Sequence, residues 1–138
     1  MSNLTVNQIE ELSPGSGNIT FNNVDITGTL TFGGGELIQT FEKSILANQN
    51  TTVWSFNANT YQAARLTLVG STSTGIESSE INIVHDGTNI YHSEYAVVSS
   101  NTNGFMINTV TLTGSTVEVK TTVTSNCTVK GTAIMVLV

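Results

Sequence analysis

Charged residues are scarce in this sequence. Asp, Glu, Lys and Arg make up 10% of its 138 residues, whereas about 25% is usual in a soluble domain. Only four residues are Lys or Arg, and the formal net charge is −6. Because a nucleic-acid backbone is bound through many cationic side chains, we expect no nucleic-acid partner.

Cysteine and long apolar runs are also nearly absent. Cys127 is the single cysteine, so no internal disulfide can form and the fold must rely on packing and strand pairing. No stretch reaches the roughly 18–20 apolar residues of a membrane span, and the start, MSNLTVNQIEEL, lacks the basic and apolar parts of a signal peptide. The glycine-containing stretches match neither a phosphate-binding loop nor a dinucleotide fingerprint. We therefore expect no membrane partner and no cofactor.

The sequence is instead rich in apolar residues that alternate with Thr, Ser and Asn, a period typical of half-buried strands. Turn signals such as ANQN, GSTSTG and SSNTNG separate the alternating segments. We predict strands over Ile38–Leu46, Thr52–Phe56, Ala63–Val69, Glu80–His85, Ile90–Val98, Gly104–Leu112, Thr116–Val123 and Thr128–Val138. About eight short strands at regular spacing indicate an all-β fold, an antiparallel β-sandwich or jelly roll formed by residues 37–138.

Residues 1–36 have a different pattern and form a predicted N-terminal arm. Their alternating segments are too short to bury a core of their own, and they end in Gly33–Gly35, which we interpret as a hinge. The stretch NQIEEL carries the signals of a single helical turn, and the rest of the arm is extended and β-rich. We predict that the arm buries apolar side chains either on its own domain or, as we favour, against another subunit. These side chains are Leu4, Val6, Ile9, Ile19, Phe21, Ile26, Leu30 and Phe32.

The stretch HDGTN, between INIV and IYHSEYAVV, predicts a β-hairpin because Asp-Gly supplies the positive φ angles of a tight turn. Its register depends on the loop length, for which two alternatives remain open. With a four-residue loop, His85 lies opposite Ile90 and His92 opposite Ile83. With a two-residue loop, His92 lies opposite Ile81, and His85 sits beside the turn.

The same hairpin contains the residues that a metal site would use: His85, His92 and Glu94. A zinc site needs three or four converging ligands, and no further His or Cys pair supports one in this sequence. A Ser-His-Asp arrangement is disfavoured as well, since adjacent residues of a strand, here His85 and Asp86, point to opposite faces. We favour a structural interpretation, in which Asp86 and Gly87 build the turn, and we predict neither a metal site nor catalytic residues.

Aromatic residues offer a different kind of site, because their faces stack on sugar rings. Trp54 and Phe56 alternate as core residues do, so we predict that they are buried. Tyr91, His92 and Tyr95 form the alternative, a ligand face on which host surface glycans could bind.

The opening of the chain resembles the N-terminal segments of structural proteins from tailed phages, particularly those of marine cyanobacteria. The resemblance rests on LTVNQIEELSPGSGNITF followed by VDITGTLTF and covers about the first quarter of the chain. The matching residues are Leu4, Val6 and Ile9, then Gly17, Ile19 and Phe21, then Ile26, Gly28, Leu30 and Phe32. The resemblance implies a β-rich virion protein, often trimeric, with an extended arm that grips the particle, and it implies no catalytic residues.

Sequence and resemblance together predict a non-enzymatic virion structural protein that is made in the host cytoplasm and displayed on the particle. Our first hypothesis is a homotrimeric capsid decoration (cement) protein, whose partners are its own copies and the major capsid or other virion proteins. A tail or head fibre component is the near alternative. A carbohydrate-binding module for host surface glycans and a metal-dependent enzyme built on His85, His92 and Glu94 are the rival hypotheses.

Overall fold

The computed structural model describes residues 29–31 and 36–137, and within them every regular element is a β-strand. These residues contain no helix that is long and apolar enough to cross a membrane. All eight strands predicted after residue 37 are confirmed, with ends that shift by a few residues. The strands are β1 (Thr29–Thr31), β2 (Glu36–Ile45), β3 (Thr51–Asn57), β4 (Tyr61–Ser71), β5 (Ile76–His85), β6 (Ile90–Ser99), β7 (Met106–Thr113), β8 (Thr116–Val123) and β9 (Cys127–Leu137).

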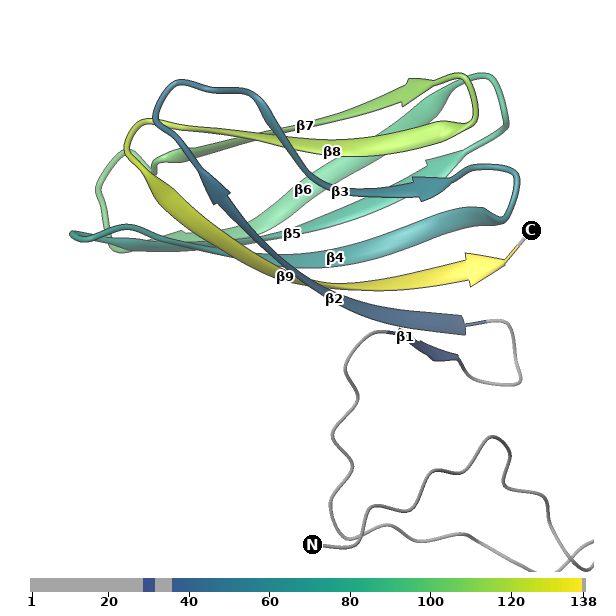
Figure 1. The fold of residues 1–138 in the computed structure, drawn as a ribbon, viewed down its shortest axis with the longest axis horizontal. Coiled ribbons are helices and arrows are strands. Elements are labelled where there is room, and N and C mark those ends of the chain that lie inside the picture. Colours follow the sequence, from purple (N-terminus) through teal and green to yellow (C-terminus); the bar gives the residue numbers. More distant parts are fainter. Residues whose placement is uncertain (1–28, 32–35, 138) are drawn as a thin grey trace, which may run out of the picture.

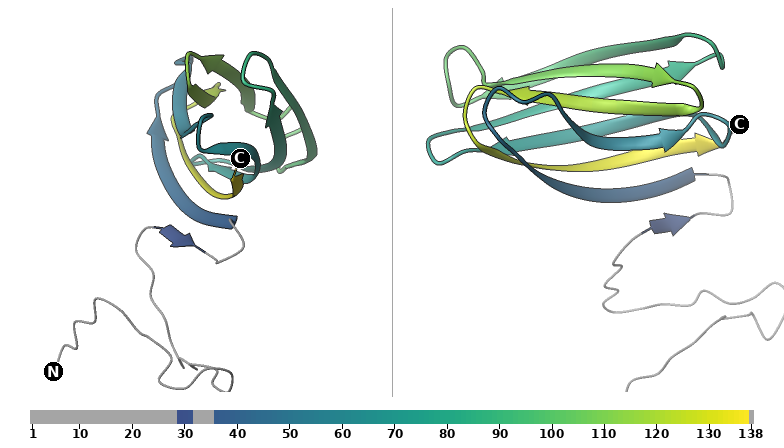
Figure 2. Two further views of the ribbon diagram at one scale, coloured as in Figure 1. Left: turned by 90° about the vertical axis from the view of Figure 1, so that its right-hand side faces the viewer. Right: turned by 45° about the horizontal axis from the view of Figure 1, so that its top comes forward.

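The strands form two antiparallel sheets that face each other, as Figures 1 and 2 show. The larger sheet has the order β1-β2-β9-β4-β5-β6 and the smaller one β3-β8-β7. The paired strands β2 and β9 continue into the other sheet as the paired strands β3 and β8, and the backbone N–H of Asn48 donates to Val123 O, 2.8 Å away, where the chain crosses. Long pairs that pass from one sheet to the other are the arrangement of a jelly roll, so the predicted fold class is confirmed.

The core lies between the two sheets and follows the alternation of each strand. On β4, Ala64, Leu66 and Leu68 point inward, while the residues between them face solvent or lie at intermediate depth. Val117 and Val119 of β8 lie opposite them in the smaller sheet and are fully buried. Each buried Leu or Val side chain among them stabilises the fold by roughly 1.5–3 kcal/mol relative to an exposed position.

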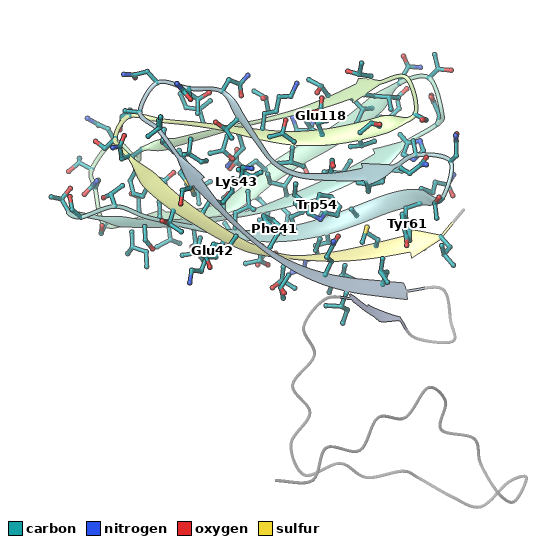
Figure 3. The ribbon with its side chains drawn as sticks, in the orientation of Figure 1. Phe41, Glu42, Lys43, Trp54, Tyr61 and Glu118 are labelled. Atoms are coloured by element: carbon teal, nitrogen blue, oxygen red, sulfur yellow. The ribbon has the colours of Figure 1, made fainter. Side chains whose placement is uncertain are left out.

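An aromatic row closes the side of the sandwich where β2 meets β3 (Figure 3). The rings of Phe41 and Trp54 are stacked with centroids 6.1 Å apart, and Trp54 and Phe56 follow at 5.3 Å. The indole N–H of Trp54 donates to Gln39 Oε1, 3.0 Å away, so its polar group is satisfied. Trp54 and Phe56 are both buried, which confirms the prediction that they belong to the core.

The predicted arm meets the sandwich through β1, which pairs with the free edge of β2. Leu30 occupies the register position opposite Ile38. Antiparallel pairing at this edge adds a short sixth strand to the larger sheet (Figure 1). The other parts of the predicted arm lie outside the described residues. These are the one-turn helix, the glycine hinge and the apolar residues Leu4, Val6, Ile9, Ile19, Phe21, Ile26 and Phe32.

Candidate functional site

The hairpin formed by β5 and β6 has the four-residue loop, which decides between the two registers left open by the sequence. His85 pairs with Ile90, and Ile83 pairs with His92. The turn closes with a hydrogen bond from the Asp86 N–H to Asn89 O at 3.2 Å, and Gly87 adopts a φ of 90°. A residue with a side chain rarely adopts that φ, so Gly87 suits this position of the turn.

Asp86 holds the turn together through its carboxylate. The backbone N–H groups of Asn89 and Thr88 donate to Asp86 Oδ1 at 2.7 Å and 2.9 Å, and the Tyr91 hydroxyl lies 3.3 Å from Oδ2. The hydrogen bonds from Asn89 and Thr88 favour the ionised form and lower the pKa of Asp86 to about 2. This geometry agrees with the structural interpretation of Asp86 and Gly87.

His85 is buried at the end of β5 and uses both ring nitrogens within the fold. Its Nε2 lies 2.6 Å from Tyr61 O, and its Nδ1 lies 3.1 Å from the Gly87 backbone N–H. Because Gly87 donates to Nδ1, the ring proton belongs on Nε2, which then donates to the carbonyl of Tyr61. The ring also packs on Phe56. Both nitrogens are therefore engaged, and neither is available to a metal ion.

His92 and Glu94 lie on the same side of the larger sheet as His85 but near its margin, where both are exposed. Glu94 Oε1 accepts a hydrogen bond from Asn108 Nδ2 at 2.7 Å, and Asn108 Oδ1 accepts one from Thr121 at 2.6 Å. These contacts tie β6 to the smaller sheet. In the part of the chain that the structure describes, no three His, Cys, Asp or Glu residues are gathered in a way that could hold a metal ion.

Tyr91 and Tyr95 lie on the opposite, outer side of the larger sheet. They pair with Val84 and Glu80 of β5, whose side chains point away from the core. The tyrosines are 55% and 37% exposed. Strand alternation directs the His92 side chain to the other side of β6, although His92 also lines the depression beside Tyr91. Of the predicted ligand face of Tyr91, His92 and Tyr95, the two tyrosines therefore share the outer side of the sheet.

Residues of three further strands complete the surface around the tyrosines. Arg65 of β4 forms an ion pair with Glu80, with Nη2 and Oε2 2.6 Å apart. The hydrogen bond to Arg65, followed by one from Tyr95, lowers the pKa of Glu80, and the same pair raises the pKa of Arg65. We name this surface the tyrosine face and define it as Arg65, Glu80, Asn82, Val84, Tyr91, Ser93, Tyr95, Ile134 and Val136.

The tyrosine face is shallow and largely apolar. Val84, Ile134 and Val136 are all substantially exposed on it. Two adjacent depressions of about 320 Å³ and 280 Å³ hollow it, and Asn82 lines both. The sequence pointed to the tyrosines but not to Arg65, Ile134 or Val136, since these reach the site only through the pairing of β4 with β5 and β9.

Comparisons with known proteins found a likeness of fold. No protein-family model and no curated protein matches the sequence. A tailspike protein from Acinetobacter baumannii bacteriophage Fri1, a capsular polysaccharide depolymerase, matches 79% of this chain with a TM-score of 0.50 and 10% identity. Tailspikes of Acinetobacter baumannii phage AM24 and Acinetobacter phage vB_ApiP_P1 match 76% and 87% of this chain at TM-scores of 0.43 and 0.46, with 9% and 13% identity.

The matched region is a part of each tailspike, because the chain spans 19%, 27% and 24% of their respective lengths. The prediction of a non-enzymatic protein is contradicted by this comparison, since the Fri1 tailspike, of which 19% is matched, is a capsular polysaccharide depolymerase. Neither a cyanophage relationship nor a capsid decoration role is supported by these structures. The fold of this chain is similar to a part of the Fri1 tailspike protein.

Proposed function

We propose that this chain is a β-sandwich domain of a phage tail appendage, of the fibre or tailspike type, and that it binds polysaccharide on the host cell surface through the tyrosine face. The observation that carries the proposal is the pair of exposed tyrosines, Tyr91 and Tyr95, on one open side of the larger sheet. The fold likeness to phage tailspikes supports the appendage role and its place on the virion.

The chemistry of the tyrosine face suits a sugar chain. Aromatic rings offer an apolar surface to the C–H face of a pyranose and hydroxyls to its rim. The Asn82 amide and the Ser93 hydroxyl lie beside Tyr91 around the same depression, and both groups donate and accept hydrogen bonds. An extended, shallow surface accommodates a polymer that lies across several strands better than a deep pocket would.

Of the two virion roles predicted from the sequence, we therefore favour the tail appendage over the capsid decoration protein. A decoration protein requires adhesion to the capsid, and the tyrosine face offers recognition chemistry that such a role does not use. The homotrimer remains a prediction for either role.

The proposal is tested with an array of bacterial surface polysaccharides probed with the purified chain and with the variants Tyr91→Ala and Tyr95→Ala. We expect binding, and we expect each substitution to weaken it by about tenfold, the effect of losing roughly 1.4 kcal/mol of stacking. The matched control is Ile107→Ala, because Ile107 is 64% exposed on β7 and lies outside the tyrosine face. An array without any bound polysaccharide, or binding that both tyrosine variants retain in full, contradicts the proposal.

A further inference from the structure

We infer that the tyrosine face selects uncharged polysaccharides and discriminates against acidic ones. This inference rests on the proposed function and concerns the substrate class of the same site. It follows from the positions of the cationic side chains and from the carboxylates with which they already form ion pairs.

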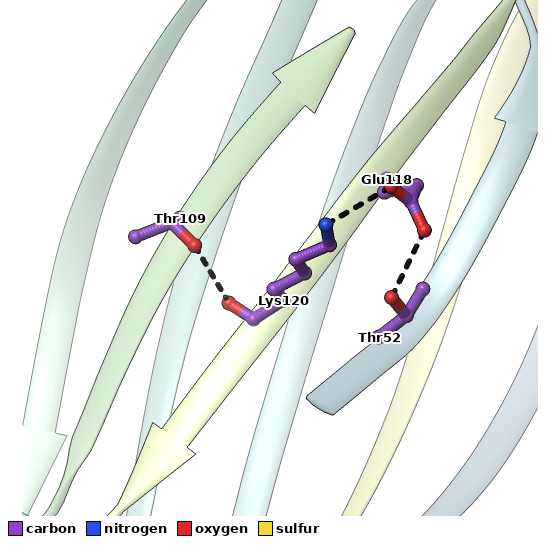
Figure 4. A network of polar contacts seen from close by, with 4 residues as sticks. All are labelled: Thr52, Thr109, Glu118 and Lys120. Atoms are coloured by element: carbon purple, nitrogen blue, oxygen red, sulfur yellow. Dashed lines mark hydrogen bonds and ion pairs between the residues drawn. The ribbon is translucent and has the colours of Figure 1, made fainter. Parts of the chain in front are cut away.

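The chain has only four Lys and Arg residues, and three of them are held by carboxylates. Arg65 pairs with Glu80 at 2.6 Å, Lys120 with Glu118 at 3.0 Å and Lys130 with Glu42 at 3.2 Å. Figure 4 shows the second pair, in which Glu118 also accepts a hydrogen bond from Thr52. An acidic sugar that approached one of these three cations would meet a charge that a carboxylate already neutralises.

The fourth cation is Lys43, and its position separates it from the tyrosines. It lies on β2 opposite Val129, a buried residue of β9. Paired residues of neighbouring strands share a side of the sheet, so Lys43 belongs to the side that faces the smaller sheet. Lys130 lies on the same outer side as Ile134, but it is four residues along β9 from Ile134 and pairs with Glu42. Among the described residues, Arg65 is the one cation within the tyrosine face as defined.

Arg65 is committed to Glu80 by hydrogen bonding as well as by charge. The hydrogen bond raises the pKa of Arg65 and lowers that of Glu80. If Arg65 turned to a ligand, Glu80 would lose this partner. The hydrogen bond from Tyr95, which also stabilises the Glu80 carboxylate, would be affected as well. Recruiting Arg65 to an acidic sugar therefore costs interactions that a neutral sugar leaves intact.

The remaining charge beside the tyrosines is negative. Asp86 stays ionised through its turn hydrogen bonds, and its Oδ2 lies 3.3 Å from the Tyr91 hydroxyl. A sugar carboxylate at Tyr91 would sit within the Debye length of about 8–10 Å of Asp86, and the chain as a whole carries a formal charge of −6. Repulsion at both ranges opposes an acidic ligand, whereas the hydroxyls of a neutral sugar can bond to Asn82, Ser93 and Tyr91.

The test uses an array of bacterial surface polysaccharides of known composition, divided into neutral and uronic-acid-containing polymers, at low and at high salt. We expect the full chain to bind neutral members at least about tenfold more tightly than acidic ones, with little change of the neutral signal with salt. Glu80→Gln releases Arg65, and we expect it to bind acidic members at low salt. Glu118→Gln is the matched control, because it releases Lys120 on the smaller sheet and should gain no such binding.

The two proposals fail in different ways. If the full chain binds acidic members as tightly as neutral ones, and Tyr91→Ala weakens both, the proposed function stands and the selection for uncharged sugars is overturned. A folded Glu80→Gln variant that gains no acidic ligand overturns the role assigned to the Arg65–Glu80 pair. If no polysaccharide binds at all, the proposed function itself fails.

Discussion

The carboxylate of Glu77, on β5, accepts a hydrogen bond from the backbone N–H of Phe105, just before β7, at 2.5 Å. A second bond of 3.3 Å comes from the N–H of Met106. Glu77 is 3% exposed, so this buried carboxylate links the larger sheet to the first residues of a strand in the smaller one. The φ of 66° at Gly104 brings its backbone against the same carboxylate, where a Cβ atom would lie 2.9 Å from Oε2.

We predict that Glu77→Ala lowers the free energy of unfolding by about 2–3 kcal/mol, because the buried N–H of Phe105 and the partly buried N–H of Met106 lose a charged acceptor. Glu77→Gln should cost less, since its amide oxygen still accepts one of the two bonds. Urea unfolding followed by Trp54 fluorescence measures both. The control is Glu42→Ala, which removes an exposed ion pair with Lys130 and should change stability by no more than about 1 kcal/mol. Equal effects of the substitutions at positions 77 and 42 would contradict the structural role of Glu77.

The strands could be predicted from the sequence because alternation is local, but the width of each sheet could not. On β8 the valines alternate with polar residues and are buried, and on β4 Ala64, Leu66 and Leu68 follow the same pattern. On β6 the segment IYHSEYAVVS also reads as a strand, yet nearly all of it is exposed. The reason is non-local: the larger sheet has six strands and the smaller three, so β6 lies at an edge with little cover.

The same distinction applies to the candidate site. Tyr91 and Tyr95 are visible in the sequence because they are four residues apart on one predicted strand. Proximity in sequence favours His92 as a third member, but strand alternation directs its side chain to the other side of β6. Arg65 and Ile134 lie on strands that are far apart in the sequence. They become neighbours through the pairing of β4 with β9, which no local sequence pattern specifies. The hydrogen bond between Glu77 and Phe105 could not be predicted for the same reason, because it joins two segments that only the folded structure brings together.

A glycine in the middle of β9 makes room for an aromatic ring. Gly131 pairs with Phe41 of β2, and a Cβ atom built on Gly131 would overlap the Phe41 ring. We predict that Gly131→Ala lowers the free energy of unfolding by about 1–3 kcal/mol through overpacking, as measured by thermal or urea unfolding. Because Phe41 stacks on Trp54, the near-ultraviolet circular dichroism of Trp54 should change as well.

The contact predicts strong coupling between the two positions. The double variant Gly131→Ala/Phe41→Leu should be less destabilised than the sum of the single changes, because the smaller side chain at position 41 removes the overlap. Additive effects on the free energy of unfolding would contradict the role of Gly131 in making room for the Phe41 ring.

Asp86 provides a pH-dependent contribution with a defined direction. Its pKa falls from 3.8 to about 2 on folding, so the folded state binds the proton less readily than the unfolded chain. The contribution to stability is thus present in full above about pH 4 and is lost as the pH falls toward 2. We predict that Asp86→Asn, which keeps an oxygen acceptor but does not titrate, loses less stability over this range than the natural chain does. Urea midpoints at a series of acidic pH values measure the difference, and parallel curves for the two proteins would contradict it.

The predicted homotrimer and the predicted role of the arm can be tested together by sedimentation equilibrium. We expect the full chain to sediment with three times its monomer mass of 14.6 kDa. Apolar residues such as Ile19, Phe21 and Ile26 need a partner surface, and their burial between subunits would favour assembly by roughly 1.5–3 kcal/mol each before ordering costs.

Two truncations separate the arm from the strand that it contributes to the sheet. A chain of residues 28–138 keeps β1 on the edge of β2, whereas a chain of residues 36–138 exposes that edge. If residues 1–27 drive assembly, both truncated chains should be monomers. If the pairing of β1 with β2 is what matters, only the shorter chain should dissociate. Trimers in all three cases would assign the subunit contacts to the sandwich itself and contradict an assembly role for the arm, because a surface shared by residues 36–138 would then be sufficient.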